Sequence, residues 1–473
     1  MSNATQFLKK FCLFVCLAAA IVSCKKDDDP VSIFAVTGST DYAFEYGQTR
    51  EIPFYQTNIK EFEVEKQPSG WQTEVENSVI RITAPQAGTS ADLVGRIVVV
   101  ATSYDLITIR QTLVVAVQTA EDLSAEATAN CYLVSEPNGR YKFRATVKGN
   151  ESASSITPSD AEIVWQYPAG LLDKVSLEEG YIFFSADSTL EITEGNAVIA
   201  ALDDEENILW SWHIWSTAYD PEQGTQTYSN GLTFMDRNLG AAGNSNATEN
   251  DILLSYGLLY QWGRKDPFVG PRYYDTSADR SIYDANGKWL SVKIVASTEE
   301  TGTIDYATAN PLTVITGSEK TEFDWLYASR NDALWGNPNS STGVNTVKGS
   351  KSLYDPCPIG WQVAPQNGWE GFVTETGDQD LIQAEGSYDY GWDFLYDGSE
   401  TTRYPSAGRR SFSKGVFTNV DLEGYDPVGF YWSNSAYASG SSMASALSFT
   451  KDLVEPVSSQ YRAGAFSIRC VKQ

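Results

Sequence analysis

Hydrophobic and polar residues alternate in short stretches from about Val31 to Gln118, and few helix signals interrupt them. Alternation with a period of two is typical of strands with one buried face, and short continuous hydrophobic stretches suit strands inside a core. The strands are expected at residues 61–65, 79–83, 95–100 and 113–117. Turns containing glycine separate them, so the pattern predicts an immunoglobulin-like (Ig-like) β-sandwich over residues 31–118.

A second series of hydrophobic stretches follows between about Glu121 and Tyr219. Strands are expected at residues 131–134, 141–147, 162–165, 181–184, 196–202 and 208–215. Asn138-Gly139 lies between the first two and is a strong hairpin signal. The pattern predicts a second all-β sandwich domain over residues 121–219.

The polar stretch 221–227 contains Pro and Gly and is the best linker candidate. Eight of the 13 Trp follow it, among short segments and many turns. One helix is expected from Asn250 to about Trp262, because Asn250 can cap it and Gly263 can end it. The last part of the chain is therefore predicted to be an α+β domain rich in loops.

The first residues have the pattern of a signal peptide. Lys9 and Lys10 precede an apolar stretch of 12 residues, 11–22, which is too short to span a bilayer as a helix. Residues 21–24 resemble a bacterial lipobox, and the resemblance implies removal of residues 1–23 and lipid attachment at Cys24. The tether 24–30 resembles the acidic export signal of Bacteroidetes surface lipoproteins. It implies exposure on the cell surface, with the periplasmic face and a plain solvated tether as alternatives.

The charge balance narrows the choice of partners. The chain has 34 Lys and Arg against 61 Asp and Glu, a formal net charge of −27. Such a field repels phosphate backbones, so no nucleic-acid partner is expected. The outer membrane, reached through the lipid, and an extracellular ligand remain as expected partners.

Motifs for catalysis or cofactors are scarce. The single histidine, His213, lies in the alternating stretch 210–215, and we expect a strand histidine there rather than a general base. Phosphate-binding loops and a G-x-S-x-G nucleophile motif are missing from the sequence. The acidic stretch 389–400 departs from the spacing of calcium loops. We therefore expect no catalytic residue, metal or cofactor, although the 61 acidic residues leave a glycan-processing enzyme of unknown type as an alternative.

Five motifs occur in order after the linker candidate, and together they resemble one family. They are Phe234–Ala241, Gly257–Pro267, Asp355–Pro365, Tyr431–Ser433 and Ile468–Val471. The series resembles the Fibrobacter succinogenes major paralogous (FISUMP) domain over residues 228–473. One position departs from the family pattern: Gly368 precedes Trp369, where the family usually has an acidic residue. This resemblance implies a C-type-lectin-like fold and a disulfide between Cys357 and Cys470. The FISUMP domain is found in Bacteroidetes lipoproteins and fimbrial adhesin subunits.

The first predicted sandwich resembles Bacteroidetes Ig-like domains of the BACON kind, in which a Trp in mid-domain, here Trp71, precedes a strand. Exposed aromatic rings next to polar groups are the usual means of holding sugars. The loops of the last domain offer four candidates for ligand binding, namely Trp289, Trp325, Trp335 and Trp392. The alternative for each is a place in the core.

The expected function is that of a non-catalytic adhesin, a surface lipoprotein whose last domain binds a glycan or a partner protein. A fimbrial tip or accessory subunit, assembled with pilus subunits by strand exchange, is the second hypothesis, with Arg50 as a candidate cleavage site. The third is the enzyme of unknown type.

Overall fold

The computed structural model describes ten stretches of the chain. They are residues 31–76, 78–117, 119–136, 139–186, 194–328, 330–337, 349–376, 379–419, 427–438 and 441–473. The predicted signal peptide, Cys24 and the tether lie outside them. The chain divides into two compact units, with the division between Thr119 and Ala120.

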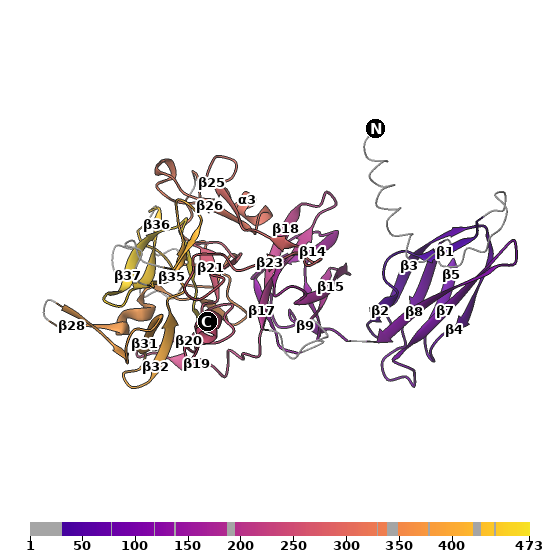
Figure 1. Cartoon of the computed structure of the whole chain (residues 1–473), viewed down its shortest axis with the longest axis horizontal. Coiled ribbons are helices and arrows are strands. Elements are labelled where there is room, and N and C mark those ends of the chain that lie inside the picture. The colour runs from indigo at the N-terminus through magenta and orange to yellow at the C-terminus, as the bar shows by residue number, and fades with distance from the viewer. Residues whose placement is uncertain are drawn as a thin grey trace. The chain divides into compact units, whose positions relative to one another are not determined.

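Unit 1 consists of two four-stranded sheets (Figure 1). One has the order β1 (Ile33–Val36), β3 (Thr49–Thr57), β6 (Val79–Thr83) and β5 (Gln72–Glu76). The other has the order β2 (Asp41–Phe44), β8 (Thr108–Val117), β7 (Val94–Ser103) and β4 (Ile59–Lys66). Phe44, Ile80 and Val99 from the two sheets share one buried core with Trp71, which precedes β5. The predicted β-sandwich and its four predicted strands are therefore confirmed.

Unit 2 begins with a second pair of sheets. A six-stranded sheet has the order β10 (Cys131–Val134), β18 (Ile208–Ser216), β17 (Gly195–Leu202), β14 (Asp160–Tyr167), β23 (Ile282–Tyr283) and β24 (Trp289–Leu290). A four-stranded sheet has the order β15 (Leu172–Glu178), β16 (Tyr181–Ala186), β11 (Arg140–Arg144) and β9 (Glu121–Asp122), and β12 (Val147–Lys148) pairs with β13 (Glu151–Ser155). Phe143, Ile182 and Trp212 pack between the two sheets.

The hairpin predicted at Asn138-Gly139 is wrong. β10 pairs with β18, whereas β11 pairs with β16 and β9, so the chain crosses from one sheet to the other between them. Asn138 itself lies outside the described residues. Local turn chemistry was outweighed here by the burial of Tyr132 and Tyr141 in the sandwich core.

The rest of unit 2 is also mostly β. Its larger sheet contains β21 (Leu258–Gln261), β22 (Phe268–Val269), β33 (Arg409–Arg410), β34 (Phe417–Thr418), β35 (Gly429–Ala436), β36 (Met443–Phe449), β37 (Val454–Tyr461) and β38 (Ala465–Ser467). A four-stranded sheet has the order β19 (Thr225–Thr227), β20 (Thr233–Met235), β39 (Cys470–Lys472) and β27 (Trp361–Val363). Smaller sheets are β25 (Lys293–Ala296) with β26 (Thr313–Thr316), β28 (Val373–Thr376) with β29 (Gln379–Ile382), and β30 (Ala384–Glu385), β31 (Gly391–Leu395) and β32 (Thr401–Pro405). Short helices are α2 (Glu249–Ser255), α3 (Ile304–Ala309), η2 (Glu319–Thr321) and η3 (Gln366–Phe372).

The helix expected from Asn250 to about Trp262 is only partly correct. Thr248 caps α2, its side chain accepting from the Asp251 amide, and the helix ends at Ser255. Gly257 follows with φ +68°, a left-handed conformation that ends a helix, and Leu258–Gln261 continues as strand β21. The linker candidate 221–227 also differs from expectation, because Thr225–Thr227 forms β19 and pairs with β20.

The segments expected as separate domains, 121–219 and 228–473, lie in one compact unit. The hairpin β23–β24, from the later segment, extends the sheet of the earlier one by pairing with β14. One hydrophobic cluster also joins Cys131, Trp165 and Trp215 to Trp262, Trp361 and Cys470. The two segments therefore share a core and a sheet.

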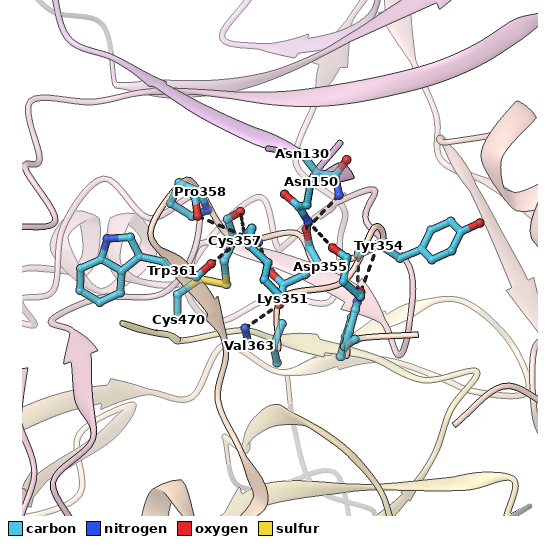
Figure 2. A network of polar contacts seen from close by, with 12 residues as sticks. Asn130, Asn150, Lys351, Tyr354, Asp355, Cys357, Pro358, Trp361, Val363 and Cys470 are labelled. Atoms are coloured by element: carbon cyan, nitrogen blue, oxygen red, sulfur yellow. Dashed lines mark hydrogen bonds and ion pairs between the residues drawn. A yellow bond between two sulfur atoms is a disulfide. The ribbon is translucent and has the colours of Figure 1, made fainter. Parts of the chain in front are cut away.

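Hydrogen bonds from side-chain amides also connect these two segments (Figure 2). The Asn130 amide donates to the carbonyl of Leu353 at 2.7 Å and to that of Asp355 at 2.9 Å. The Asn150 amide donates to the carbonyls of Ser352 and Asp355, the latter at 3.0 Å. Loop 352–355 is thus held by side chains that come from the sandwich.

Candidate functional site

Two of the four Trp residues predicted to bind ligand are buried. Trp325 is 1% and Trp335 0% exposed, and both belong to the main core cluster. The Trp325 indole donates to the carbonyl of Trp262 at 2.8 Å, and that of Trp335 to Tyr354 at 3.1 Å. Because neither ring presents a face to solvent, these two predictions are corrected to core positions.

Trp392 is half-buried on β31. Its indole donates to the carbonyl of Thr450 at 3.0 Å, and its ring lies edge-on to Tyr388 at a centroid distance of 5.3 Å. The ring packs against the cluster around Phe394 and Phe449. Most of this side chain is therefore committed to internal contacts.

Trp289 is the one of the four that is open to solvent, with 61% of its surface exposed. It lies on β24, the edge strand of the six-stranded sheet, directly opposite the half-buried Tyr283. Side chains opposite each other in an antiparallel pair lie on the same face, so the two rings are neighbours. The structure brings this Trp together with a Tyr that the sequence did not single out.

The turn that carries Trp289 is held by its own hydrogen bonds. The Asp284 carboxylate accepts from the amides of Asn286 and Lys288, each at 2.9 Å, and Gly287 has φ +74°. An Asx-type turn with a left-handed glycine fixes the loop, and the Gln166 amide on β14 adds a hydrogen bond to the Asp284 carbonyl at 3.3 Å. Asn286 and Lys288 are exposed on the same turn, so the hairpin carries both an exposed aromatic ring and hydrogen-bond donors and acceptors.

A small pocket with both polar and apolar lining lies against the same sheet. Its volume is about 20 Å³, and its lining includes Trp165, Tyr167, Glu194, Asn196 and Arg280. A volume of this size holds about one water molecule or one hydroxyl group. The pocket is thus too small for a cofactor.

Two polar atoms in the lining of this pocket have no hydrogen-bond partner among the described residues: Nε1 of Trp165 and Oε2 of Glu194. The indole needs an acceptor and the carboxylate needs a donor, and a hydroxyl supplies both. The Arg280 guanidinium closes one side, 4.7 Å from the ring centre of Tyr167. Sequence patterns gave no signal for these residues, because they meet only through the pairing of β14 with distant segments.

Lys351 and Asp355 form a buried ion pair at 3.2 Å (Figure 2). The ammonium also donates to the carbonyls of Cys357 and Trp361, each at 2.6 Å, and of Pro358 at 3.1 Å. Burial lowers the pKa of Lys351, while the carboxylate of Asp355 works against that shift. With so many acceptors, this ammonium is a structural crosslink rather than a free base.

The disulfide between Cys357 and Cys470 is present, as predicted. Cys131 is the free cysteine of the described residues and is buried. Burial raises the pKa of its thiol, so it stays protonated at neutral pH.

A second buried ion pair joins Lys265 to Asp266 at 2.6 Å. Ser211 on β18 lies between them, its hydroxyl donating to Asp266 at 2.6 Å while the Lys265 ammonium donates to the carbonyl of Ser211 at 2.9 Å. Burial lowers the pKa of Lys265. Ser211 is 1% exposed, so the arrangement joins β18 to the loop after β21 and gives no access to a substrate.

His213 lies on β18, as predicted, and is 2% exposed. Its Nε2 lies 2.8 Å from Oδ1 of Asn196, whose amide donates to the carbonyl of Gly240. Burial lowers the pKa of His213 to about 3, so the ring is neutral at physiological pH. The pairing with Asn196 makes it a structural strand residue.

Asp324 is a fully buried carboxyl group. It accepts from the Leu326 amide at 3.1 Å and lies 4.0 Å from the Arg462 guanidinium. Burial raises its pKa from the ordinary 3.8 to about 6, although Arg462 acts in the opposite direction. The folded protein therefore holds this proton more tightly than the unfolded chain does.

This group gives a pH prediction. Its contribution to the stability of unit 2 is fully present below about pH 3.8 and is lost as the pH rises through about 6. A shift of this size corresponds to about 3 kcal/mol. Asp324→Asn should remove that part of the pH dependence, measured as the wild-type minus variant difference in urea unfolding between pH 4 and 7. The same change at exposed Asp305 serves as control, and parallel curves for wild type and Asp324→Asn would contradict the assignment.

In the described stretches of the chain, no group of three or more His, Cys, Asp or Glu is arranged to hold a metal ion. Among the helices described, none is long and apolar enough to cross a membrane.

Both units are built mainly from β-sheets, and unit 1 is a β-sandwich. No protein-family model and no curated protein match the chain. The resemblances to BACON and FISUMP domains and the lectin-like fold accordingly stay predictions.

Solved structures that are similar to parts of the chain include β-sandwich proteins. The D00-D0 domain of intimin matches with a TM-score of 0.17 and 10% identity, over 38% of this chain and 96% of that one. A titin I-band fragment, I67-I69, matches with a TM-score of 0.14 and 12% identity, over 39% of this chain and 64% of that one. A third match is SGBP-B of the Bacteroides ovatus mixed-linkage glucan utilization locus, in complex with a mixed-linkage heptasaccharide. Its TM-score is 0.13 and its identity 11%, over 40% of this chain and 45% of that one. TM-scores this low carry no argument about function.

Proposed function

We propose that this protein is a bacterial surface lipoprotein, anchored to the outer membrane through Cys24, that binds an extracellular glycan without catalysis. The observation that carries the binding role is Trp289, 61% exposed on an edge strand beside Tyr283. An exposed indole stacks well on the apolar face of a sugar ring, and neighbouring polar groups can hold its hydroxyls. Asn286 and Lys288 on the same turn supply such groups.

The role of the buried acids supports binding rather than turnover. Asp266 is paired with Lys265, and Asp355 with Lys351. Asp324 accepts a backbone hydrogen bond and faces Arg462. Each of these carboxyls is engaged in internal contacts, whereas glycoside hydrolysis needs a pair of carboxyls that face the substrate.

Arg50, the candidate cleavage site of the fimbrial hypothesis, lies within β3, opposite Ile82 of β6. Its guanidinium lies 5.4 Å from the ring centre of Phe44. Removal of the chain before Arg50 would take β1 and β2 from the two sheets and leave their core residues Phe34 and Phe44 missing. We therefore favour the anchored protein with its first strand intact.

The test of the binding role uses the full chain on a glycan array. Trp289→Ala should weaken binding to the retained glycans by about tenfold or more, the size typical of a central aromatic contact. Tyr273→Ala is the matched control, because Tyr273 is an aromatic residue of unit 2 with 57% exposure. Binding to a protein panel alone would favour a protein ligand, and no binding to either panel would refute the proposal.

The anchor is tested separately by mass spectrometry of the mature N-terminus. Acyl groups are expected on Cys24, and Cys24→Ser should abolish them. An unmodified Cys24 would refute the anchor and leave the glycan test untouched.

A further inference from the structure

Unit 1 has an exposed apolar end. Val31 is 69%, Tyr104 68%, Leu106 77% and Ile107 47% exposed. The last three belong to the loop between β7 and β8. These four residues are called the apolar tip below.

The tip is a single structural feature rather than a set of scattered side chains. The Asn58 amide donates to the hydroxyl of Ser32 at 3.0 Å and to the Asp105 carboxylate at 2.6 Å. Asn58 also accepts, through its carbonyl, from the Tyr104 amide at 3.2 Å. Asn58 thus joins the chain next to Val31 to the loop next to Leu106.

The loop is well ordered by its own contacts. The Ser103 hydroxyl accepts from the amides of Asp105 at 3.2 Å and Ile107 at 3.1 Å. The Ser103 amide donates to the carbonyl of Ile107 at 2.9 Å, and the Leu106 amide donates to the carbonyl of Ser103 at 3.0 Å. A loop held in this way presents its side chains in a fixed arrangement.

Leu106 occupies an unfavourable backbone position. Its φ is +63°, in the left-handed region where Gly and Asn are preferred and a bulky residue is rare. The side chain of Leu106 is 77% exposed, so its burial does not offset the energetic cost of this backbone conformation. Such an outlier points to a function outside the folded domain.

The position of the tip along the chain indicates what covers it. Val31 follows Cys24 by seven residues, a reach of about 25 Å when fully extended. If Cys24 is acylated, the end of unit 1 that carries Val31 stays within this distance of the bilayer. Leu, Ile and Tyr are side chains that partition into the membrane interface.

We propose that the apolar tip inserts into the lipid surface and so holds unit 1 against the membrane. This inference rests on the proposed anchor at Cys24 but not on glycan binding. An anionic lipid surface is disfavoured, because it would repel a chain with a formal net charge of −27. A zwitterionic surface is therefore the expected partner.

The experiment uses residues 24–473 with Cys24→Ser, which lack the predicted apolar signal segment 11–22 and cannot be acylated, and phosphatidylcholine vesicles in a sedimentation assay. We expect measurable partition, and a loss of about tenfold on Leu106→Ser, because burial of one leucine supports a change of that order. Val94→Ser is the matched control, since Val94 is 68% exposed and lies at the opposite end of β7. That end is about 30 Å from Ser103.

Leu106→Gly separates membrane contact from folding. Glycine relieves the left-handed strain, so this variant should unfold at the same temperature as wild type or higher while it loses vesicle binding. No vesicle binding by the parent protein, or equal losses for Leu106→Ser and Val94→Ser, would overturn the proposal. A failed glycan array or an unmodified Cys24 would leave this measurement unaffected, so failure of the tip and failure of the proposed function are distinguishable.

Discussion

Replacing Lys351 with methionine is expected to lower the free energy of unfolding of unit 2 by about 3–5 kcal/mol, because it leaves Asp355 as an uncompensated buried charge. The Lys351 side chain is 8% and that of Asp355 0% exposed. The same change also leaves the carbonyls of Cys357, Pro358 and Trp361 without their shared donor. Asp355 additionally accepts from the amides of Cys357 and Val363, each at 2.9 Å (Figure 2).

The measurement is denaturant unfolding followed by tryptophan fluorescence. All Trp residues except Trp71 lie in unit 2, so the emission reports mainly on that unit. Lys472→Met is the matched control, because Lys472 forms an exposed ion pair with Glu222 and should contribute less than about 1 kcal/mol. Lys351→Met combined with Asp355→Asn should recover part of the loss. Equal effects of Lys351→Met and Lys472→Met would contradict the structural role given to the buried pair.

Removal of the disulfide by Cys357→Ser and Cys470→Ser should destabilise unit 2 by about 4–5 kcal/mol. The bond closes a loop with a sequence separation of 113 residues, and its main effect is to restrict the unfolded chain. The same loss is expected for wild type after full reduction in denaturant.

Cys131→Ala is the control for the disulfide experiment. This free cysteine is buried, so the variant should keep the oxidised mobility on a non-reducing gel and lose less stability than the double variant. Unfolding curves of oxidised and reduced protein that coincide would contradict the prediction. Lys351 donates to the carbonyl of Cys357, so the stability losses from Lys351→Met and from removal of the disulfide need not add.

The sequence was most informative for unit 1. Its strands bury one face each, and alternation such as that of Val79–Thr83 records this burial directly. Trp71 precedes β5, as expected of a Trp before a strand, and it is 2% exposed in the core. In a small sandwich, most of the needed information is local to each strand.

Unit 2 was less predictable because its elements depend on distant partners. The residues of β21 continue the helical pattern of α2, but their pairing with β38 decides in favour of a strand. The pairing of β23 with β14 joins residues 283 and 166, and no local signal indicates it. A division into domains near residue 220 was therefore expected, and a single compact unit is found.

The candidate site shows the same limit. Composition identified loops rich in Trp, but it could not show that Trp289 is exposed whereas Trp325 and Trp335 are buried. The neighbour of Trp289 on the sheet, Tyr283, follows from strand pairing that only the structure provides. The partnerless atoms of Trp165 and Glu194 likewise come from segments far apart in the sequence.

The place of β39 has a consequence for export. Cys470–Lys472 pairs with both β20 and β27, so this sheet cannot assemble until these residues are available. A chain that crosses a membrane from its N-terminus would complete unit 1 early, whereas unit 2 would wait, with many apolar residues uncovered, for residues 470–472. If the chain is exported as proposed, its translocation should require a holding chaperone for the second unit, and premature stop codons shortly before residue 470 should yield protease-sensitive chains rather than shortened folded ones.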